Sequence, residues 1–164
     1  MTGVQTCALP ILASPANQTG AVQSEETVRA LAELGLPLVS DEIYDGLVYD
    51  DARVSSALAV CEDAFVLDGF SKRYAMTGFR LGYVVVPPTA LRRLQILQQN
   101  LFISANHFVQ HAGLAALEHG GPTVAAMRAA YDRRRHLLVQ GLRDRKSTRL
   151  NSSHMSESRM PSSA

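Results

Sequence analysis

The sequence predicts an α/β fold with a partial, mostly parallel sheet that is covered by helices and followed by a long helix. In the first half, short apolar runs of the buried-strand type are joined by a helical pattern and by turn-rich loops. In the second half, helical patterns follow one another without a further strand. Strands that alternate with helices are typical of parallel sheets whose faces the helices cover.

The first half begins with an extended segment from Ile11, which passes into the loop 14–20. This loop is dense in Ser, Pro, Asn and Gly, which favour turns. Ser24 is suited to cap a helix that starts with two glutamates, where the helix dipole favours acids. Gly35 is suited to end the helix. Three short strands follow, expected over residues 37–40, 65–67 and 81–86.

In the second half, threonine, serine and proline stand where three helical patterns begin. Threonine and serine cap helices with their hydroxyl groups, and proline fits the first helical turn. Glycines 120 and 121 separate the last two patterns. We therefore expect helices over about residues 89–103, 104–119 and 122–145.

Composition excludes several classes of protein. With 46% hydrophobic and 19% charged residues, the chain is typical of a soluble globular protein. A formal net charge of +1 argues against a nucleic-acid partner. No apolar run approaches the roughly 20 residues that a membrane span needs. Cys7 and Cys61 have no metal-like spacing. We expect reduced thiols, no metal site and a cytoplasmic location.

Both ends of the chain differ from its middle. Residues 146–164 contain seven serines and no aromatic residue. Such a segment cannot bury enough apolar surface to become ordered, and it resembles translated adaptor sequence. Residues 1–10 have the same character. We interpret residues 1–10 as a non-native leader and residues 146–164 as a disordered, non-native tail, so that the middle is an internal piece of a longer protein.

Polar side chains gather after the expected strand ends, where open α/β sheets bind ligands. A lysine amine forms a Schiff base, and an arginine with a serine hydroxyl binds phosphate. A carboxylate stabilises a protonated ring nitrogen, and tyrosine and asparagine hydrogen-bond a ring oxygen. Together these groups fit pyridoxal 5′-phosphate. The residues are Asn17, Asp41, Tyr44, Ser71, Lys72 and Arg80.

Three segments carry a resemblance to a known family. SPANQTG, SDEIYDGLVYD and the segment from Ser71 to Tyr83 resemble, in order and spacing, the class I/II aminotransferases of the aspartate aminotransferase fold. The resemblance covers about residues 11–145. It implies that residues 11–121 form the C-terminal half of the large cofactor-binding domain. Residues 122–145 would be the long helix towards a small domain that this chain lacks.

The resemblance also implies roles for the site residues. Lys72 would be the Schiff-base lysine and proton shuttle, and Asp41 would pair with the pyridine nitrogen. The ring hydroxyl would contact Tyr44 and Asn17, and the phosphate would be held by the remaining pair, Ser71 and Arg80. The implied reaction moves an amino group from an amino acid to a 2-oxo acid, in a parent enzyme that is a homodimer. A phosphate loop, a ring-stacking aromatic residue and a substrate-binding arginine have no counterpart here, so we expect the chain alone to be inactive.

One position departs from the family. Gln18 stands where the family usually has proline, in the motif Asn-Pro-Thr-Gly. A cis bond before glutamine would cost about 2.5–4 kcal/mol, whereas a cis bond before proline costs little. The placement of Asn17 is therefore the part of the resemblance that most needs a structure.

Three alternatives remain open at this point. In the first, the parent is another fold-type-I pyridoxal-phosphate enzyme, such as a lyase, a decarboxylase or a cyclising enzyme. In the second, the parent is a transcriptional regulator with an aminotransferase-like effector domain, which a winged-helix segment upstream would reveal. In the third, the reading frame is an assembly artefact, which mass spectrometry of the native product would reveal.

Overall fold

The computed structural model describes residues 10–144. The expectations for residues 1–9 and 145–164 lie outside the described residues. In chain order, the elements are β1 (Ile11–Ala13), α1 (Glu25–Ala32), β2 (Val39–Asp41), η1 (Ala57–Ala59), β3 (Phe65–Gly69), η2 (Thr77–Phe79), β4 (Gly82–Val85), α2 (Pro88–Leu101), α3 (His107–His119) and α4 (Gly121–Asp144). The α/β class and the long final helix are confirmed.

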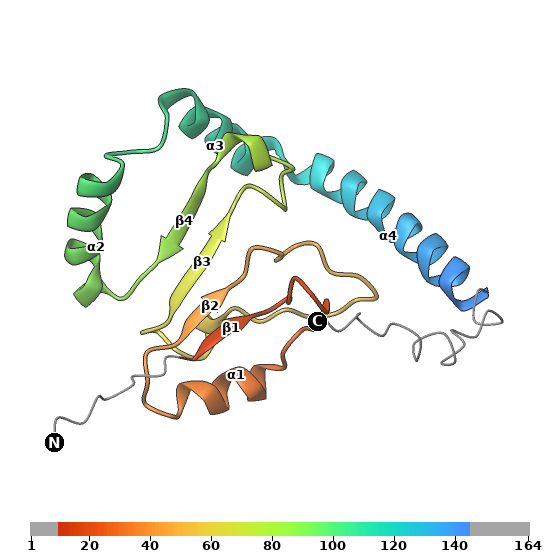
Figure 1. Ribbon diagram of the computed structural model, residues 1–164, viewed down its shortest axis with the longest axis horizontal. Coiled ribbons are helices and arrows are strands. Elements are labelled where there is room, and N and C mark those ends of the chain that lie inside the picture. Colours follow the sequence, from red (N-terminus) through yellow and green to blue (C-terminus); the bar gives the residue numbers. More distant parts are fainter. Residues whose placement is uncertain (1–9, 145–164) are drawn as a thin grey trace, which may run out of the picture. The chain divides into compact units, whose positions relative to one another are not determined.

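The described residues form one four-stranded sheet with the order β1-β2-β3-β4 (Figure 1). The first three strands are parallel, and Ala13, Asp41 and Leu67 lie side by side in register. The fourth strand pairs antiparallel with β3. Residues 70–81 turn back through a short 3₁₀ segment, η2, instead of a crossover helix, so β4 returns in the opposite direction. The expected mostly parallel sheet is confirmed.

The core lies between α1, η1 and the central strands. Ser24 caps α1 as expected, since its Oγ accepts a hydrogen bond from Thr27 N at 3.2 Å. Val28 of α1 packs with Leu38 and Val66, and all three side chains are almost completely buried. This packing fixes the position of β2 and β3, whose carboxyl ends carry the expected site residues.

Two helices begin one to three residues away from the expected caps. Pro88 begins α2, with Pro87 at the cap position, because proline has no N–H to leave unpaired in a first turn. Ser104 lies in a tight turn in which its N–H donates to Phe102 O at 2.7 Å. Asn106 therefore takes the cap position of α3.

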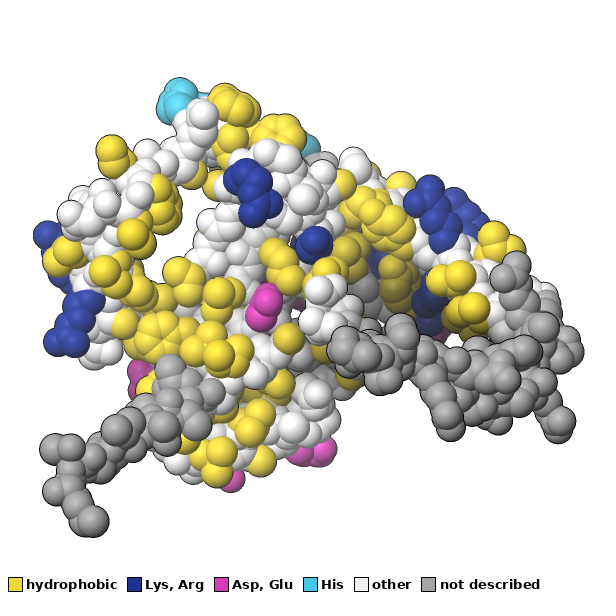
Figure 2. Space-filling view, viewed as in Figure 1, with side chains coloured by type: hydrophobic (Ala, Val, Ile, Leu, Met, Phe, Trp, Pro, Cys, Tyr) yellow, Lys and Arg dark blue, Asp and Glu magenta, His cyan; other side chains and the backbone are white. Residues whose placement is uncertain are grey.

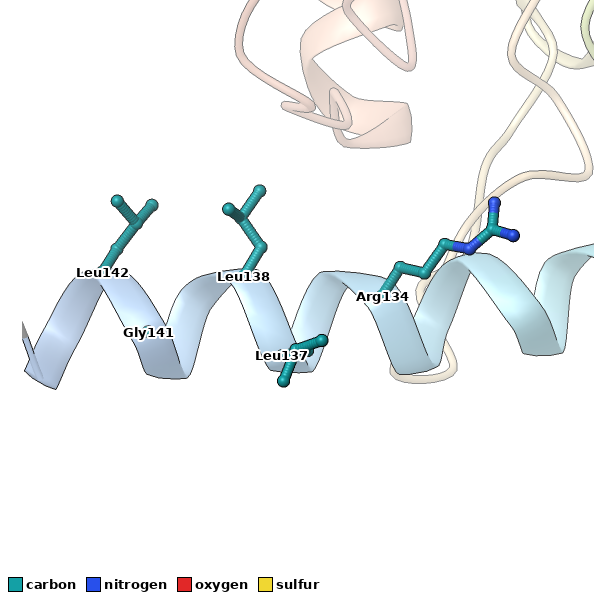
Figure 3. Close-up of a pocket in the computed structure, with 5 residues that line it drawn as sticks. All are labelled: Arg134, Leu137, Leu138, Gly141 and Leu142. Carbon is teal, nitrogen blue, oxygen red and sulfur yellow. The ribbon is translucent and has the colours of Figure 1, made fainter.

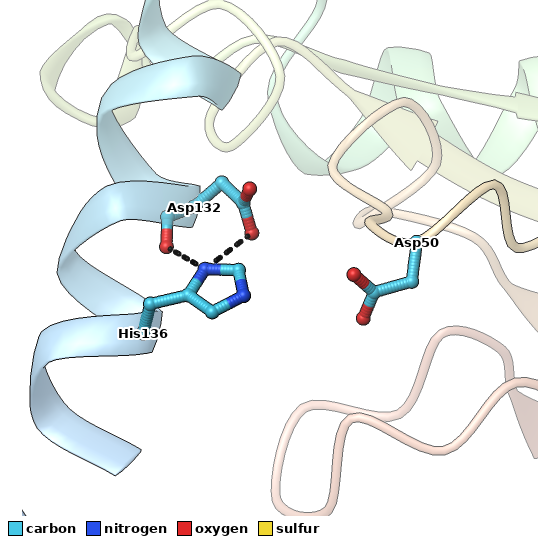
Figure 4. Close-up of side chains that lie close together, drawn as sticks. All are labelled: Asp50, Asp132 and His136. Carbon is cyan, nitrogen blue, oxygen red and sulfur yellow. Dashed lines mark hydrogen bonds and ion pairs between the residues drawn. The ribbon is translucent and has the colours of Figure 1, made fainter. Parts of the chain in front are cut away.

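The chain divides into two compact units, and the second begins at Ala129 within α4. In this second unit, Asp132 accepts from Arg135 at 2.8 Å, and His136 Nδ1 lies 2.9 Å from the Asp132 carbonyl oxygen (Figure 4). Asp50, which Figure 4 also labels, belongs to the first unit. Leu138 and Leu142 project from the same side of the helix and are largely exposed (Figure 3).

Hydrophobic side chains are also exposed in the first unit. Figure 2 shows them along α2 and over the strands on the visible face. No residue of α2 is buried, and Leu97 and Leu101 are 55% and 76% exposed. Among residues 10–144, no helix is long and apolar enough to cross a membrane.

Candidate active site

The expected site residues follow the carboxyl ends of the parallel strands. Asp41 is the last residue of β2, Asn17 lies in the loop after β1, and Lys72 lies in the turn after β3. Because these three strands are parallel and in register, their following loops leave the same edge of the sheet. This edge is where open α/β sheets bind ligands. The fold therefore gathers the loops that the sequence predicts.

The loops after β1 and β2 are joined by a hydrogen bond. The Tyr44 hydroxyl donates to Asn17 Oδ1 at 2.7 Å. Gln18 does not prevent this contact, although the family motif has proline at its position. Among the described residues, the cis peptide bond is the one between Ser14 and Pro15.

The turn after β3 places Lys72 against Tyr44. The Lys72 Nζ lies 5.8 Å from the centroid of the Tyr44 ring, within the range of a cation–π contact. Both residues are half-buried. The printed sequence contains two lysines, Lys72 and Lys146, and the described part contains Lys72 alone. Any Schiff base in the described part must therefore form at Lys72.

Asp41 is held by its own turn. Its Oδ1 accepts a hydrogen bond from Ile43 N at 3.1 Å, which fixes the orientation of the carboxylate. A carboxylate has about four acceptor positions, so this bond leaves capacity for a ligand. The half-buried side chain lies at the edge described above.

Ser71 and Arg80 lie at the two ends of one turn, and Thr77 is hydrogen-bonded to both of them. Thr77 Oγ1 donates to the Ser71 carbonyl at 3.0 Å, and Arg80 Nη1 donates to the Thr77 carbonyl at 3.0 Å. Arg80 has a φ of 54°, in the left-handed region that few residues other than glycine adopt. Thr77 is not among the predicted site residues, although a hydroxyl residue three positions before Arg80 is visible in the sequence.

The exposed guanidinium of Arg80 borders an open hollow of about 470 Å³, which Asn106 and Phe108 also line. Since one of five N–H donors is used by Thr77, the guanidinium keeps donors for an anion. The site contacts thus form two groups: Asn17, Tyr44 and Lys72 in one, and Ser71, Thr77 and Arg80 in the other. The two groups are covalently connected, because Ser71 of one group and Lys72 of the other are consecutive residues.

Glu42 is a second residue that the sequence analysis missed. Its side chain is 6% exposed, and its Oε1 accepts from Ser40 Oγ at 3.0 Å and from Ala57 N at 2.8 Å. A buried carboxylate with two donors is a structural link, which ties the end of β2 to η1. Its place after Asp41 gives no signal, because glutamate is mostly exposed and its burial here depends on the contacts with Ser40 and Ala57.

Tyr83 on β4 forms a cross-strand contact beside the Lys72 turn. Its hydroxyl donates to Asp68 Oδ2 at 2.7 Å, and the two residues are opposite each other in the β3–β4 register. Partial burial, together with the hydrogen bond and charge of Asp68, raises the pKa of Tyr83 from 10.0 to about 12. This contact fixes the register of β4.

Comparisons with known proteins agree with this fold. The family of aminotransferase class I and II matches residues 3–157. A probable aspartate aminotransferase of Methanocaldococcus jannaschii is 37% identical over 146 residues, which are 83% of this chain and 39% of the relative. An arginine–pyruvate transaminase of Pseudomonas aeruginosa is 39% identical over 139 residues, which are 81% of this chain and 35% of the relative.

A solved structure of an aminotransferase from Mycobacterium tuberculosis superposes with a TM-score of 0.81 at 37% identity, over 84% of this chain and 37% of that structure. The sheet and the comparisons therefore point to the same fold. The chain belongs to the class I and II aminotransferase family. It spans little more than a third of the length of the curated relatives that it matches.

Proposed function

We propose that this chain is the part of a longer aminotransferase that carries the cofactor-binding lysine, and that the cofactor is pyridoxal 5′-phosphate. The observation that carries the proposal is the contact group in which Lys72 Nζ lies 5.8 Å from the Tyr44 ring while Tyr44 donates to Asn17. The longer protein is called the parent enzyme below. Mass spectrometry of the native product distinguishes this proposal from the alternative of an assembly artefact.

The donor set fits this cofactor. An amine, a carboxylate, a hydroxyl–amide pair and an exposed guanidinium lie at or beside one sheet edge, and a phosphorylated pyridine aldehyde uses all four. When bound, pyridoxal 5′-phosphate supplies the electron sink for reactions at the α-carbon of an amino acid.

Each residue has a separate task in this proposal. Lys72 binds the cofactor covalently through Nζ and, once free, carries a proton at Nζ. Asp41 binds the pyridine N–H through its carboxylate, which Ile43 N already orients. Tyr44 and Asn17 bind the ring hydroxyl. The phosphate is bound by the Ser71 hydroxyl and the Arg80 guanidinium.

The substrates of the parent enzyme are proposed only as a class, an amino acid and a 2-oxo acid. Relatives of similar identity have different named substrates, aspartate in one case and arginine with pyruvate in another. The domain assignment is also a proposal: residues 11–121 in the large domain and 122–145 in the helix towards the small domain. The parent enzyme is also proposed to be a cytoplasmic homodimer. Sedimentation of the purified parent enzyme would test the dimer.

Steady-state kinetics of the parent enzyme test the proposal. Lys72→Arg keeps a cation beside Tyr44 but has no amine that can lose its proton. We expect kcat to fall by about 10²- to 10⁴-fold, because a positioned proton-transfer group contributes a rate factor of that size. Added methylamine should partly restore the activity of Lys72→Ala. Wild-type turnover in both variants would contradict the proposal.

A further inference from the structure

Arg73, the residue after Lys72, makes contacts that none of the roles above uses. Its Nη1 lies 3.2 Å from Asp45 Oδ2, and both side chains are half-buried. Its Cζ also lies 5.8 Å from the centroid of the Tyr74 ring. The ion pair joins the turn after β3 to the turn after β2, since 28 positions separate its two residues.

Gly46 makes room for this arginine. A Cβ at Gly46 would lie 2.9 Å from Arg73 Nε, closer than real Cβ atoms approach another atom, and 3.1 Å from Arg73 Cζ, which is also a tight contact. The φ of Gly46 is 80°, which also favours glycine. The arginine side chain therefore lies directly across the Gly46 backbone. Its Nε is buried without a hydrogen-bond partner among the described residues, so this position costs desolvation that the other contacts must offset.

Successive residues of the two turns are paired with each other. Lys72 lies over the ring of Tyr44, and the next residue, Arg73, is paired with the next residue, Asp45. A cation over a partly exposed ring is a weak attraction, and a lysine side chain has four rotatable bonds. The Tyr44 contact alone is therefore too weak to hold Lys72. A second connection between the same two turns limits the freedom of the backbone that carries it.

We propose that Arg73 is a positioning residue, which holds Lys72 against Tyr44 through the Asp45 ion pair and the contact with Gly46. The inference rests on the proposed function, because it concerns the geometry of the proposed Schiff-base lysine. It differs from an ordinary exposed ion pair, which contributes little to stability. The chain offers a matched ion pair of that kind, Arg29 with Glu25 on α1, at 2.9 Å.

The test uses the parent enzyme with the variants Arg73→Gln, Asp45→Asn, their double variant and Arg73→Lys, with Arg29→Gln as control. The double variant removes one charge of each sign, so it separates geometry from charge. We expect both single variants and the double variant to lower kcat by roughly 10- to 100-fold, the effect of a small misplacement of a catalytic group. KM should stay within about twofold, because substrate binding is not altered.

Two further results are expected. The double variant should be no worse than either single variant, because all three lose the same connection. Arg73→Lys should recover part of kcat, since it keeps the charge but not the flat contact with Gly46. If Arg73→Gln folds poorly, Arg73→Lys and Asp45→Asn still test the inference. Additive losses, or an effect no larger than that of Arg29→Gln, would overturn it.

A second readout needs no cofactor. The rate at which an acylating reagent modifies Lys72 is measured in the cofactor-free parent enzyme. A lysine model compound in the same solution serves as the internal reference for the rate. We expect the double variant to react roughly threefold faster or more, as a side chain released from a weak contact becomes accessible. An unchanged rate overturns the inference whether or not Lys72 binds the cofactor. If borohydride labels Lys72 in the wild-type parent enzyme, but the variants have the wild-type kcat and acylation rate, the inference is refuted. The proposed function then still stands.

Discussion

The Tyr44 hydroxyl donates a 2.7 Å hydrogen bond to Asn17 Oδ1 across 27 positions of sequence. It joins the loop after β1 to the turn after β2, at the edge where the parallel strands end. The same tyrosine ring lies below the Lys72 amine. One side chain thus connects two loops and faces the residue on which the proposed chemistry depends.

This hydrogen bond predicts coupling between its two partners. Tyr44→Phe and Asn17→Ala should each lower the affinity of the parent enzyme for pyridoxal 5′-phosphate. In the double variant, the losses should be less than additive by about 0.5–1.5 kcal/mol, the contribution of one hydrogen bond. Equilibrium titration of the cofactor by absorbance measures this coupling. Fully additive losses would show that the bond does not form in the parent enzyme.

Arg80 should distinguish a phosphorylated ligand from one without phosphate. Charge-assisted hydrogen bonds contribute about 1.5–3 kcal/mol, so Arg80→Gln should weaken pyridoxal 5′-phosphate binding by roughly 10- to 150-fold. Binding of pyridoxal, which has no phosphate, should change by less than about threefold, since no such bond is lost. Arg29→Gln on α1 is the control. Equal losses for both ligands would argue that Arg80 has a purely structural role.

Glu42 predicts a loss of stability without a direct effect on chemistry. Glu42→Ala removes the acceptor of the buried Ala57 N–H and should cost roughly 1–3 kcal/mol of unfolding free energy. Glu42→Gln keeps a carbonyl oxygen and should cost clearly less. Denaturant unfolding of the parent enzyme compares the two variants. The interpretation fails if glutamine is as destabilising as alanine.

Tyr83 predicts a dependence of stability on alkaline pH. Because its folded pKa is raised from 10.0 to about 12, the folded protein keeps the proton longer than the unfolded chain. The stability contribution is complete below pH 10 and is lost as the pH rises through about 12. Tyr83→Phe should flatten the unfolding free energy over this window, whereas the control Tyr131→Phe should not. An unchanged slope in Tyr83→Phe would assign the dependence to another group.

The fold was predictable because its elements are short and strongly patterned. Apolar runs that end in polar residues place the end of β2 at residue 40, one residue before Asp41, and Ser24 marks the start of α1 by its hydroxyl. The starts of α2 and α3 were misplaced by one to three residues. At these two helix starts, the turn before the helix determines which residue takes the cap position, Pro87 for α2 and Asn106 for α3.

The site was predictable as a set of residues but not as a set of contacts. A lysine after a strand is visible in the sequence, but its position over Tyr44 depends on two turns brought together by the sheet register. The left-handed conformation of Arg80 has no sequence signal, because glycine is the residue expected there. The same holds for Arg73 and Asp45, whose pairing exists only after β2 and β3 have paired.

Borohydride reduction of the parent enzyme with pyridoxal 5′-phosphate, followed by peptide mapping, tests the central claim most directly. Reduction makes the bond between cofactor and lysine permanent, so the labelled peptide identifies the lysine. The account predicts a single label at Lys72, which Lys72→Arg abolishes. A label at another lysine, or no label at all, would contradict it.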